Sequence, residues 1–215
     1  MPTLGYWKIR GLAQPIRLLL HYVEENFNDK MYEQGDAPDY SRECWMKEKN
    51  NLGLSFPNLP YYIDGPIKIT QSNAILRYIA RKHNLLGKTT ESQVRVDMML
   101  DQAMEFRNGI VRLVYNPNYE SLKVDYFLQL PSKLEVFENF LGSNKFFGGD
   151  EVTVCDFPMY ELLDQSRIMD PTCLEKFEKI SAFMDRFESL PQIKEYTSSP
   201  NFMKRPINNK IAAFK

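Results

Sequence analysis

The chain has 215 residues, and its 27 lysine and arginine residues nearly balance 28 aspartate and glutamate residues, for a net charge of −1. Hydrophobic residues make up 43% of the chain and charged residues 26%, which is typical of a globular protein and excludes a disordered one. This length predicts one large domain or two small ones. Because neither half of the sequence carries a basic arm or an acidic tail, we expect no nucleic-acid partner.

The cysteine and histidine residues are few and widely spaced. Three cysteines, Cys44, Cys155 and Cys173, form no CxxC pair, and the histidines are His21 and His83. This pattern predicts neither a disulfide framework nor a metal site. It is typical of a reducing compartment, so we expect a cytoplasmic protein. No stretch approaches the roughly 20 apolar residues that span a bilayer, and we expect no membrane association.

The first eighty residues alternate between strand and helix patterns. Apolar residues recur at helical spacing after Ala13, and Asp64-Gly65 is a strong hairpin signal between two short apolar runs. The predicted elements, in chain order, are a strand over residues 3–9, a helix over 13–24, a strand over 28–32, a helix that contains Trp45 and Lys49 and is capped by Ser41, strands over 61–63 and 67–70, and a helix over 71–82. This order predicts an α/β unit with a mixed sheet.

From Asn84 onward the patterns are helical. Residues 84–90 form a polar connection, and a capping-box variant pairs Thr153 as N-cap with Asp156, with Val152 positioned to pack on Phe157. The predicted helices span residues 94–115, 123–141, 153 to about 169, 174–188 and a short segment after Pro191. We therefore predict two domains, an α/β domain over residues 1–83 and an all-α domain over residues 90–215.

Three places in the first domain can carry chemistry, and each also has a purely structural interpretation. Tyr6 ends the first strand at the edge of the sheet where such folds bind ligands, but an aromatic ring there can simply pack. A cis Pro60 would turn the backbone of Leu59 outward, but trans proline is far more common. Ser72, at a helix start, can face a carboxylate or merely cap the helix.

Two helix faces are ambiguous in the same way. Trp45 and Lys49 are four residues apart and can clamp a carboxylate, or they can be a packed indole beside a solvated charge. In the long helix, a stripe at spacing i, i+4, i+7 and i+11 fits either a core face or a pocket wall, and its members are Met104, Asn108, Val111 and Tyr115.

Taken together, the motifs resemble those of the cytosolic glutathione transferases, and of their mu class in particular. The resemblance extends over both predicted domains. The matching segments are Leu4-Gly5-Tyr6-Trp7 with Arg10-Gly11-Leu12, Gly35-Asp36-Ala37-Pro38-Asp39-Tyr40, Leu52-Gly53-Leu54 with Phe56-Pro57-Asn58-Leu59-Pro60, Ile69-Thr70-Gln71-Ser72-Asn73-Ala74-Ile75 with Arg77-Tyr78, and Val152 to Phe157. The resemblance implies a thioredoxin-like domain with a four-stranded mixed sheet, followed by an all-helical domain. It also implies an enzyme that activates the thiol of glutathione, a co-substrate and not a cofactor, for transfer to hydrophobic electrophiles.

The resemblance further implies that glutathione lies against the first domain. Tyr6 would donate its hydroxyl hydrogen to the glutathione sulfur, and Leu59, before a cis Pro60, would pair its backbone with the cysteinyl part. Gln71 and Ser72 would hold the γ-glutamyl end at a helix N-terminus. The residues implied around the glycyl end are Trp7, Arg42, Trp45, Lys49 and Asn58, and Leu12 would border both ligands.

For the electrophile, the resemblance implies a pocket between the long helix and the first domain. Tyr115 would hydrogen-bond a leaving or epoxide oxygen, so Tyr6 and Tyr115 are the candidate catalytic residues. The implied pocket residues are Ile9, Leu12, Met104, Asn108, Val111 and Tyr115.

A homodimer is also implied. Phe56 lies in a loop with no helix or strand face to cover it, and in the family the matching ring docks into the neighbouring subunit. Two positions depart from the family pattern. Residue 105, usually an aspartate that reaches the partner's glutathione amine, is Glu105, and the Asn208-Asn209 tail is more polar than the family's pocket-lining segment. These departures leave the range of electrophiles open.

Two other functions are compatible with a protein of this kind. The first is a non-catalytic carrier or crystallin of the same fold, against which the presence of Tyr6 and Tyr115 argues. The second is a thiol-disulfide oxidoreductase, which needs a cysteine at the first βα turn, where this chain has Tyr6 and Trp7.

Overall fold

The computed structural model describes the chain from residue 1 to residue 215. Its first part holds a four-stranded sheet in the order β2-β1-β3-β4. The strands are β1 (Thr3–Trp7), β2 (Asn28–Tyr32), β3 (Tyr61–Asp64) and β4 (Ile67–Thr70). β1 pairs with β2 in parallel and with β3 antiparallel, so Gly5 lies between Lys30 and Tyr61. The predicted mixed sheet is confirmed, although β1 ends at Trp7 and not at residue 9.

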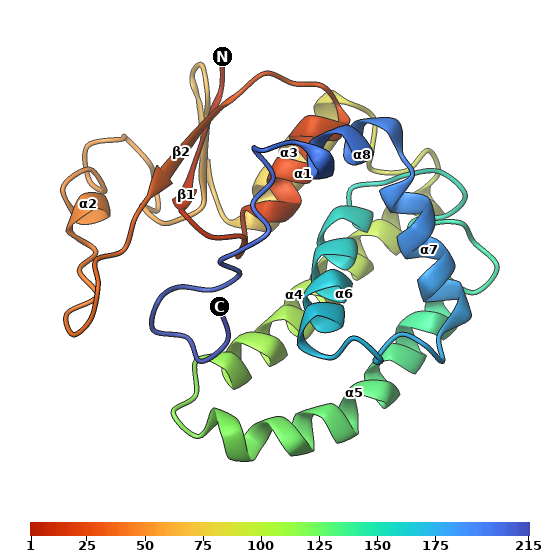
Figure 1. Ribbon diagram of the computed structural model, residues 1–215. Helices are drawn as coiled ribbons and strands as arrows, with labels where there is room; N and C mark the ends of the chain where they lie inside the picture. Colours follow the sequence, from red (N-terminus) through yellow and green to blue (C-terminus); the bar gives the residue numbers. More distant parts are fainter.

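Three helices accompany the sheet, namely α1 (Gln14–Tyr22), α2 (Glu43–Met46) and α3 (Ser72–Lys82). α1 and α3 pack together between the sheet and the later helices, whereas α2 lies on the outer side, beyond β2 (Figure 1). The apolar residues Ile16, Leu19 and Leu20, which predict α1, are fully buried. Burial of each such side chain stabilises the fold by about 1.5–3 kcal/mol.

The remainder of the chain is helical. Its helices are α4 (Thr90–Val114), α5 (Tyr119–Leu141), α6 (Asp156–Met169), α7 (Glu178–Glu188) and α8 (Pro191–Ser198). α6 is the central helix, because every residue from Asp156 to Ser166 is buried, and the other helices surround it (Figure 1). One continuous hydrophobic core reaches from Leu4 in the sheet to Phe157 in α6.

Several helices begin at other residues than predicted. α4 starts at Thr90 and not at residue 94, because Thr89 and Ser92 form a capping box there. α5 starts at Tyr119 and not at residue 123. α7 starts at Glu178 and not at residue 174, because turns take up residues 171–176.

The predicted N-cap of α6 is wrong by two residues, since Cys155 and not Thr153 occupies that position. Asp156 is the first helical residue, and its carboxylate accepts hydrogen bonds from the backbone N–H groups of Thr153 and Phe147, each at 2.7 Å. The aspartate half of the predicted capping box therefore exists, and it also fixes the preceding loop.

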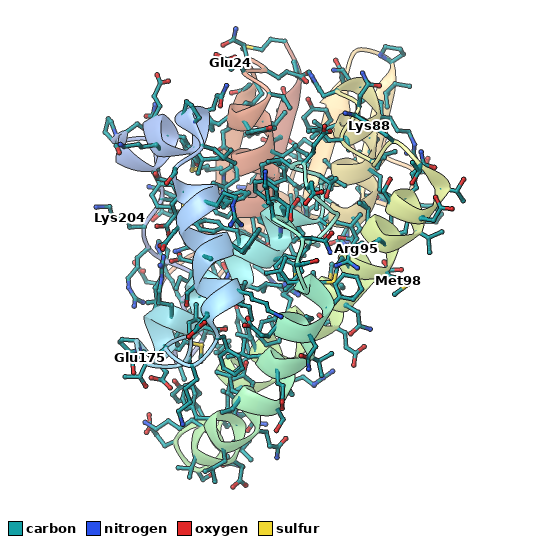
Figure 2. The ribbon with its side chains drawn as sticks, turned by 90° about the vertical axis from the view of Figure 1, so that its right-hand side faces the viewer. Glu24, Lys88, Arg95, Met98, Glu175 and Lys204 are labelled. Carbon is teal, nitrogen blue, oxygen red and sulfur yellow. The ribbon has the colours of Figure 1, made fainter.

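Arg95 of α4 fixes the far end of the same loop. Its Nε donates to the Phe147 carbonyl oxygen at 2.7 Å, and its guanidinium lies 3.8 Å from the ring centroid of Phe140 (Figure 2). No helix is both long enough and apolar enough to cross a membrane. No group of three or more His, Cys, Asp or Glu side chains comes together as a candidate metal site.

Candidate active site

A cavity of about 570 Å³ opens between the end of β1, the α2 segment, α4 and the C-terminal segment of the chain. Ten of the predicted site residues line it, namely Tyr6, Trp7, Ile9, Arg42, Trp45, Lys49, Asn58, Leu59, Val111 and Tyr115. Seven others do not, namely Leu12, Pro60, Gln71, Ser72, Met104, Glu105 and Asn108. A larger cavity of about 850 Å³, among α6, α7 and α8, contains none of the predicted site residues.

Tyr6 lies near the end of β1 with its side chain almost fully buried. Its hydroxyl oxygen accepts a hydrogen bond from the backbone N–H of Leu12 at 3.1 Å. Burial raises the pKa of Tyr6 above its ordinary value, and the Leu12 N–H opposes that shift. The phenol therefore stays protonated at neutral pH, and its hydrogen is free to be donated into the cavity.

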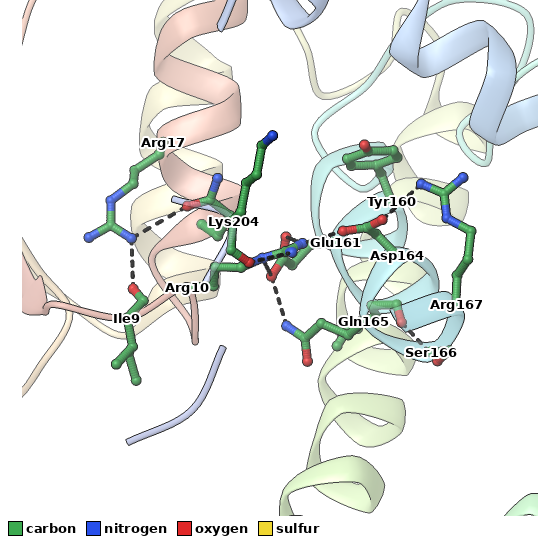
Figure 3. Close-up of polar contacts among 12 residues, drawn as sticks. Ile9, Arg10, Arg17, Tyr160, Glu161, Asp164, Gln165, Ser166, Arg167 and Lys204 are labelled. Atoms are coloured by element: carbon green, nitrogen blue, oxygen red, sulfur yellow. Dashed lines mark hydrogen bonds and ion pairs between the residues drawn. The ribbon is translucent and has the colours of Figure 1, made fainter. Parts of the chain in front are cut away.

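The loop that supplies the Leu12 N–H is held from two sides. Arg10 is buried, and its guanidinium contacts Glu161 at 2.7 Å and Asp164 at 2.5 Å, both on α6 (Figure 3). Arg10 and Gly11 also donate their backbone N–H groups to the carbonyl oxygens of Pro206 and Ile207, at 2.9 and 3.0 Å.

Gly11 itself cannot be replaced without strain. Its φ is +42°, and an added Cβ would come within 2.7 Å of the Tyr6 hydroxyl oxygen. A side chain at this position would therefore displace the phenol that the loop supports.

The α2 segment forms the cationic end of the cavity. Trp45 is buried against Tyr32 and Tyr61, with ring centroids 5.4 and 6.0 Å apart. Lys49 lies beyond the end of α2, but its N–H donates to the Trp45 carbonyl at 2.9 Å, so the predicted one-turn spacing holds. Ser41 is not the N-cap as predicted, because Arg42 holds that position. The Ser41 hydroxyl instead accepts from the Glu43 N–H at 3.3 Å.

Leu59 and Pro60 lie between the α2 segment and β3. Their peptide bond is cis, which is the isomer that the resemblance implied. The Leu59 N–H donates to the Asn58 side-chain oxygen at 2.9 Å. A peptide that pairs with this N–H must therefore displace the Asn58 carboxamide.

Gln71 and Ser72 lie at the start of α3, outside the lining of the cavity. Ser72 is the first helical residue and Gln71 occupies the N-cap position, so the predicted Ser72 cap is wrong. Gln71 has a φ of +74°, which is a strained conformation for a residue with a side chain. No side chain caps α3, so its first N–H groups remain available to an anion.

The opposite wall comes from α4 and the C-terminal segment. Burial raises the pKa of Tyr115, and its hydroxyl oxygen accepts a hydrogen bond from the Asn209 N–H at 2.9 Å. Its hydroxyl hydrogen, like that of Tyr6, is therefore free. Met104 and Asn108 lie on the same helix but do not reach the lining of this cavity.

Sequence reasoning missed part of this lining, namely Gly11, Met46 and Arg107, whereas the resemblance already pointed to the Asn208-Asn209 tail as a pocket-lining segment. Arg107 had a signal, because it follows Met104 by three residues and precedes Val111 by four, and so lies on the same face of the helix. Only the resemblance indicated the place of the Asn208-Asn209 tail, because no local pattern encodes the bond across 94 residues that joins Asn209 to Tyr115.

Phe56 and Glu105 lie on the surface. Phe56 is 76% exposed, and Glu105 is exposed and accepts a hydrogen bond from Gln102 at 3.3 Å. A cavity of about 180 Å³ between α4 and α5 includes Glu105 and Phe106 in its lining.

The comparisons with known proteins cover nearly the entire chain. The family models for the glutathione S-transferase N-terminal and C-terminal domains match residues 2–81 and 104–200. Glutathione S-transferase Mu 2 of Mus musculus is 52% identical over 98% of this chain and 96% of its own length. Glutathione S-transferase Mu 3 of Homo sapiens is 52% identical over 98% of this chain and 93% of its own length.

Solved structures agree. The glutathione S-transferase Blo t 8 matches with a TM-score of 0.90 and 34% identity, covering 99% of both chains. The pi-class glutathione S-transferase of Onchocerca volvulus matches with a TM-score of 0.87 and 32% identity, over 98% of this chain and 99% of its own. The predicted thioredoxin-like domain with its mixed sheet and the following all-helical part are thereby confirmed. The chain belongs to the glutathione transferase family, and within it to the mu class.

Proposed function

We propose that this protein activates the thiol of glutathione as a thiolate and conjugates it to hydrophobic electrophiles, with Tyr6 and Tyr115 as the catalytic residues. The observation that carries this proposal is the orientation of Tyr6. Its hydroxyl oxygen already accepts the Leu12 N–H, so the hydroxyl hydrogen is left for an acceptor in the cavity. A thiolate is such an acceptor, and a hydrogen bond to it stabilises the ionised form.

Glutathione carries two carboxylates, and the chain offers an electropositive group for each. Arg42 and Lys49, beside Trp45, hold the glycyl carboxylate, with Trp7 and Asn58 completing this end. Gln71 and Ser72 place the γ-glutamyl carboxylate at the uncapped start of α3. The backbone of Leu59, before Pro60, pairs with the cysteinyl residue, and Leu12 borders the sulfur.

The hydrogen bond from Tyr6 accounts for only part of the rate. A free thiol has a pKa near 8.5, so only about 3% is thiolate at pH 7. A charge-assisted hydrogen bond worth about 1.5–3 kcal/mol lowers the thiol pKa by roughly 1–2 units. The thiolate fraction then rises by up to about 24-fold, while its intrinsic nucleophilicity falls by roughly 6- to 10-fold. Positioning of the sulfur against the electrophile must supply most of the acceleration.

The electrophile lies against the wall formed by Ile9, Val111 and Tyr115, and Leu12, Met104 and Asn108 lie at the edge of this wall. Tyr115 has a free hydroxyl hydrogen and donates it to an epoxide or leaving-group oxygen.

A homodimer completes the proposal. Phe56 is 76% exposed, and the cavity of about 180 Å³ between α4 and α5 has the size and the aromatic floor to receive its ring from a second copy. Met98, which is 52% exposed on the outer face of α4, extends the apolar surface there (Figure 2). Glu105 then lies at the same interface, where its carboxylate reaches the partner's glutathione amine.

The sheet-bearing residues 1–83 and the helical residues 90–215 form two domains, since every strand lies before residue 71 and every element after residue 89 is a helix. The free thiols of Cys44, Cys155 and Cys173 suit a reducing cytoplasm.

A titration of the bound thiol tests the proposal. Tyr6→Phe keeps the fold and glutathione binding, but the pKa of bound glutathione, followed by thiolate absorbance, rises by about 1–2 units. Tyr119→Phe, which alters a tyrosine outside the cavity, serves as the matched control. An unchanged thiol pKa in Tyr6→Phe removes Tyr6 from this role. A wild-type protein that conjugates glutathione to no aryl halide, epoxide or enal contradicts the function itself.

A further inference from the structure

The cavity at Tyr6 holds more positive charge than glutathione needs. Its lining includes Arg42, Lys49 and Arg107, and it includes no aspartate or glutamate. None of these three cations makes a salt bridge within the chain. The Arg107 guanidinium donates one hydrogen bond, from its Nη1 to the Asn108 side-chain oxygen at 3.3 Å, and this acceptor carries no charge.

Arg107 is separated from the other two cations by the fold. Arg42 and Lys49 belong to the α2 segment beside Trp45, whereas Arg107 belongs to α4, one turn before Val111. Its positive charge opposes the burial that raises the pKa values of Tyr6 and Tyr115. Arg107, Tyr6 and Tyr115 line the same cavity, and Val111 and Tyr115, which follow Arg107 in the chain, belong to the wall that we assign to the electrophile.

A second, smaller cavity of about 300 Å³ adjoins this wall and shares Ile9, Asn208 and Asn209 with the first. The charged residues of its lining are four cations and one carboxylate, namely Lys8, Arg205, Lys210, Lys215 and Glu33. Lys8 contacts Glu33 at 3.2 Å and Lys210 contacts Asp36 at 2.7 Å, but Arg205 stacks over the Phe214 ring and has no carboxylate partner. The surface beside the electrophile end of the first cavity thus carries a net positive charge.

We propose, on the basis of the proposed function, that this protein selects electrophiles that combine an apolar body with an anionic group such as a carboxylate, and that Arg107 contacts that group. The two carboxylates of glutathione are accounted for at α2 and at α3. A purely apolar electrophile would cover the half-buried Arg107 guanidinium without giving it a partner, which is unfavourable. An anionic group supplies that partner.

The reaction itself does not change. With an activated aryl chloride, the glutathione sulfur bonds to the ring carbon that carries the chlorine, and the carbon–chlorine bond breaks. Chloride leaves with the bonding electron pair, and the thiol proton passes to solvent. The carboxylate on the ring takes no part in bond exchange and serves only as a handle for Arg107.

A matched pair of substrates tests the proposal, namely a chlorodinitrobenzoate and its methyl ester, which differ in one negative charge. Each kcat/KM is divided by the uncatalysed rate with glutathione, so that the intrinsic reactivity of the ring cancels. The wild-type protein should favour the carboxylate by about tenfold, as expected for one charge-assisted hydrogen bond. This preference should decline as added salt screens the charges.

Variants identify the residue. Arg107→Gln should abolish the preference for the carboxylate, and Arg107→Lys should keep part of it. Lys179→Gln makes the same change in net charge at an exposed position on α7 and should leave the preference intact.

Two outcomes overturn the proposal. Equal normalised rates for the two substrates show no selection, and an Arg107→Gln variant that loses the same factor on both substrates shows that Arg107 supports the thiolate instead. Absence of turnover with both substrates overturns this inference, whereas the proposed function fails only if the protein also conjugates glutathione to no other aryl halide, epoxide or enal.

Discussion

The two walls of the cavity are built differently. The wall that we assign to glutathione is built on Tyr6, Trp45 and Leu59, each less than 10% exposed, with the more exposed Trp7, Arg42, Lys49 and Asn58 at its glycyl end. The wall that we assign to the electrophile combines the buried Ile9 with Arg107, Val111, Tyr115 and Asn209, which are all partly exposed. We call them the glutathione wall and the electrophile wall.

The supports of the two walls differ as well. Behind Tyr6, two buried carboxylates of α6 hold Arg10, and two backbone bonds hold the loop to the C-terminal segment. The Tyr115 hydroxyl is held by one backbone N–H. The wall that binds one invariant peptide is supported by buried ion pairs and backbone hydrogen bonds. The wall that binds varied electrophiles is supported by few interactions. This difference predicts large effects for changes behind the glutathione wall and small, substrate-dependent effects for changes in the electrophile wall.

The largest expected effect follows from Phe56, two residues before Asn58 of the glutathione wall's loop. Phe56→Ala removes two exposed rings from a twofold dimer and should weaken association by about 3–6 kcal/mol. Glutathione should bind more weakly as a result, because the site loses the partner's Glu105. Sedimentation velocity measures the dissociation constant of the dimer. Calorimetric titration measures the affinity for glutathione. A variant that stays fully dimeric at nanomolar concentration contradicts the anchor role of Phe56.

The next largest effect tests the support behind Tyr6. Arg10→Met leaves Glu161 buried without a cation, while Asp164 keeps its pair with Arg167, and should lower the free energy of unfolding at neutral pH by about 3–5 kcal/mol. Lys8→Met, which breaks the exposed pair with Glu33, should change it by less than about 0.5 kcal/mol. Equal effects of the two substitutions in urea denaturation would contradict the comparison of the walls.

The decrease in the free energy of unfolding caused by Arg10→Met should also depend on pH. Burial already raises the pKa of Glu161 above its ordinary value, and removal of Arg10 raises it further. A carboxyl with a raised pKa in the folded state stabilises the fold fully below its unfolded pKa of about 4.3, and this stability is lost as the pH rises through the folded pKa. The deficit of Arg10→Met should therefore be smaller at pH 5 than at pH 7.5. A deficit that grows as the pH falls would show that the carboxylates are not its cause.

A smaller effect is expected in the electrophile wall. Tyr115→Phe should slow epoxide opening by about tenfold or more and leave aromatic substitution largely unchanged, because only the epoxide oxygen needs a proton donor. Steady-state kinetics with one substrate of each type give the answer. Equal slowing of both reactions would show that Tyr115 acts through packing or product release.

The smallest expected effect belongs to Glu105. Glu105→Ala removes one exposed carboxylate, and glutathione should bind a few-fold more weakly while the dimer remains intact. Glu175→Ala, which removes another exposed carboxylate that does not line the cavity between α4 and α5, is the control. Unchanged glutathione affinity in Glu105→Ala would mean that the site is not shared between subunits.

Features with a local cause were predictable from the sequence. The hairpin at Asp64-Gly65 and the helices α1 and α3 were predicted, because residues close together in the sequence determine the turn and the apolar spacing. Helix starts were less predictable, because caps compete with turns over a few residues, as Cys155 replacing Thr153 at the start of α6 shows.

Contacts across long stretches of sequence were not predictable. The pair of Arg10 and Glu161 joins positions 151 residues apart, and the bond from Asn209 to Tyr115 joins positions 94 apart. No local pattern records such a pair. Arg107 is a different case, since its helical spacing was visible but a charged residue in a helix is usually a solvated one.

The C-terminal segment bears on how the protein is made. Pro206 and Ile207 bind the loop beneath Tyr6, Asn209 binds Tyr115, and Ala213 donates its N–H to the carbonyl of Val114 at 2.8 Å. These residues follow β1, the α2 segment and α4, which form the rest of the cavity, and a ribosome therefore synthesises them later. All four strands are synthesised well before this segment, yet neither tyrosine then has its final surroundings. Catalytic competence should consequently appear only after residues 206–213 have been synthesised, so nascent chains that lack them cannot conjugate glutathione.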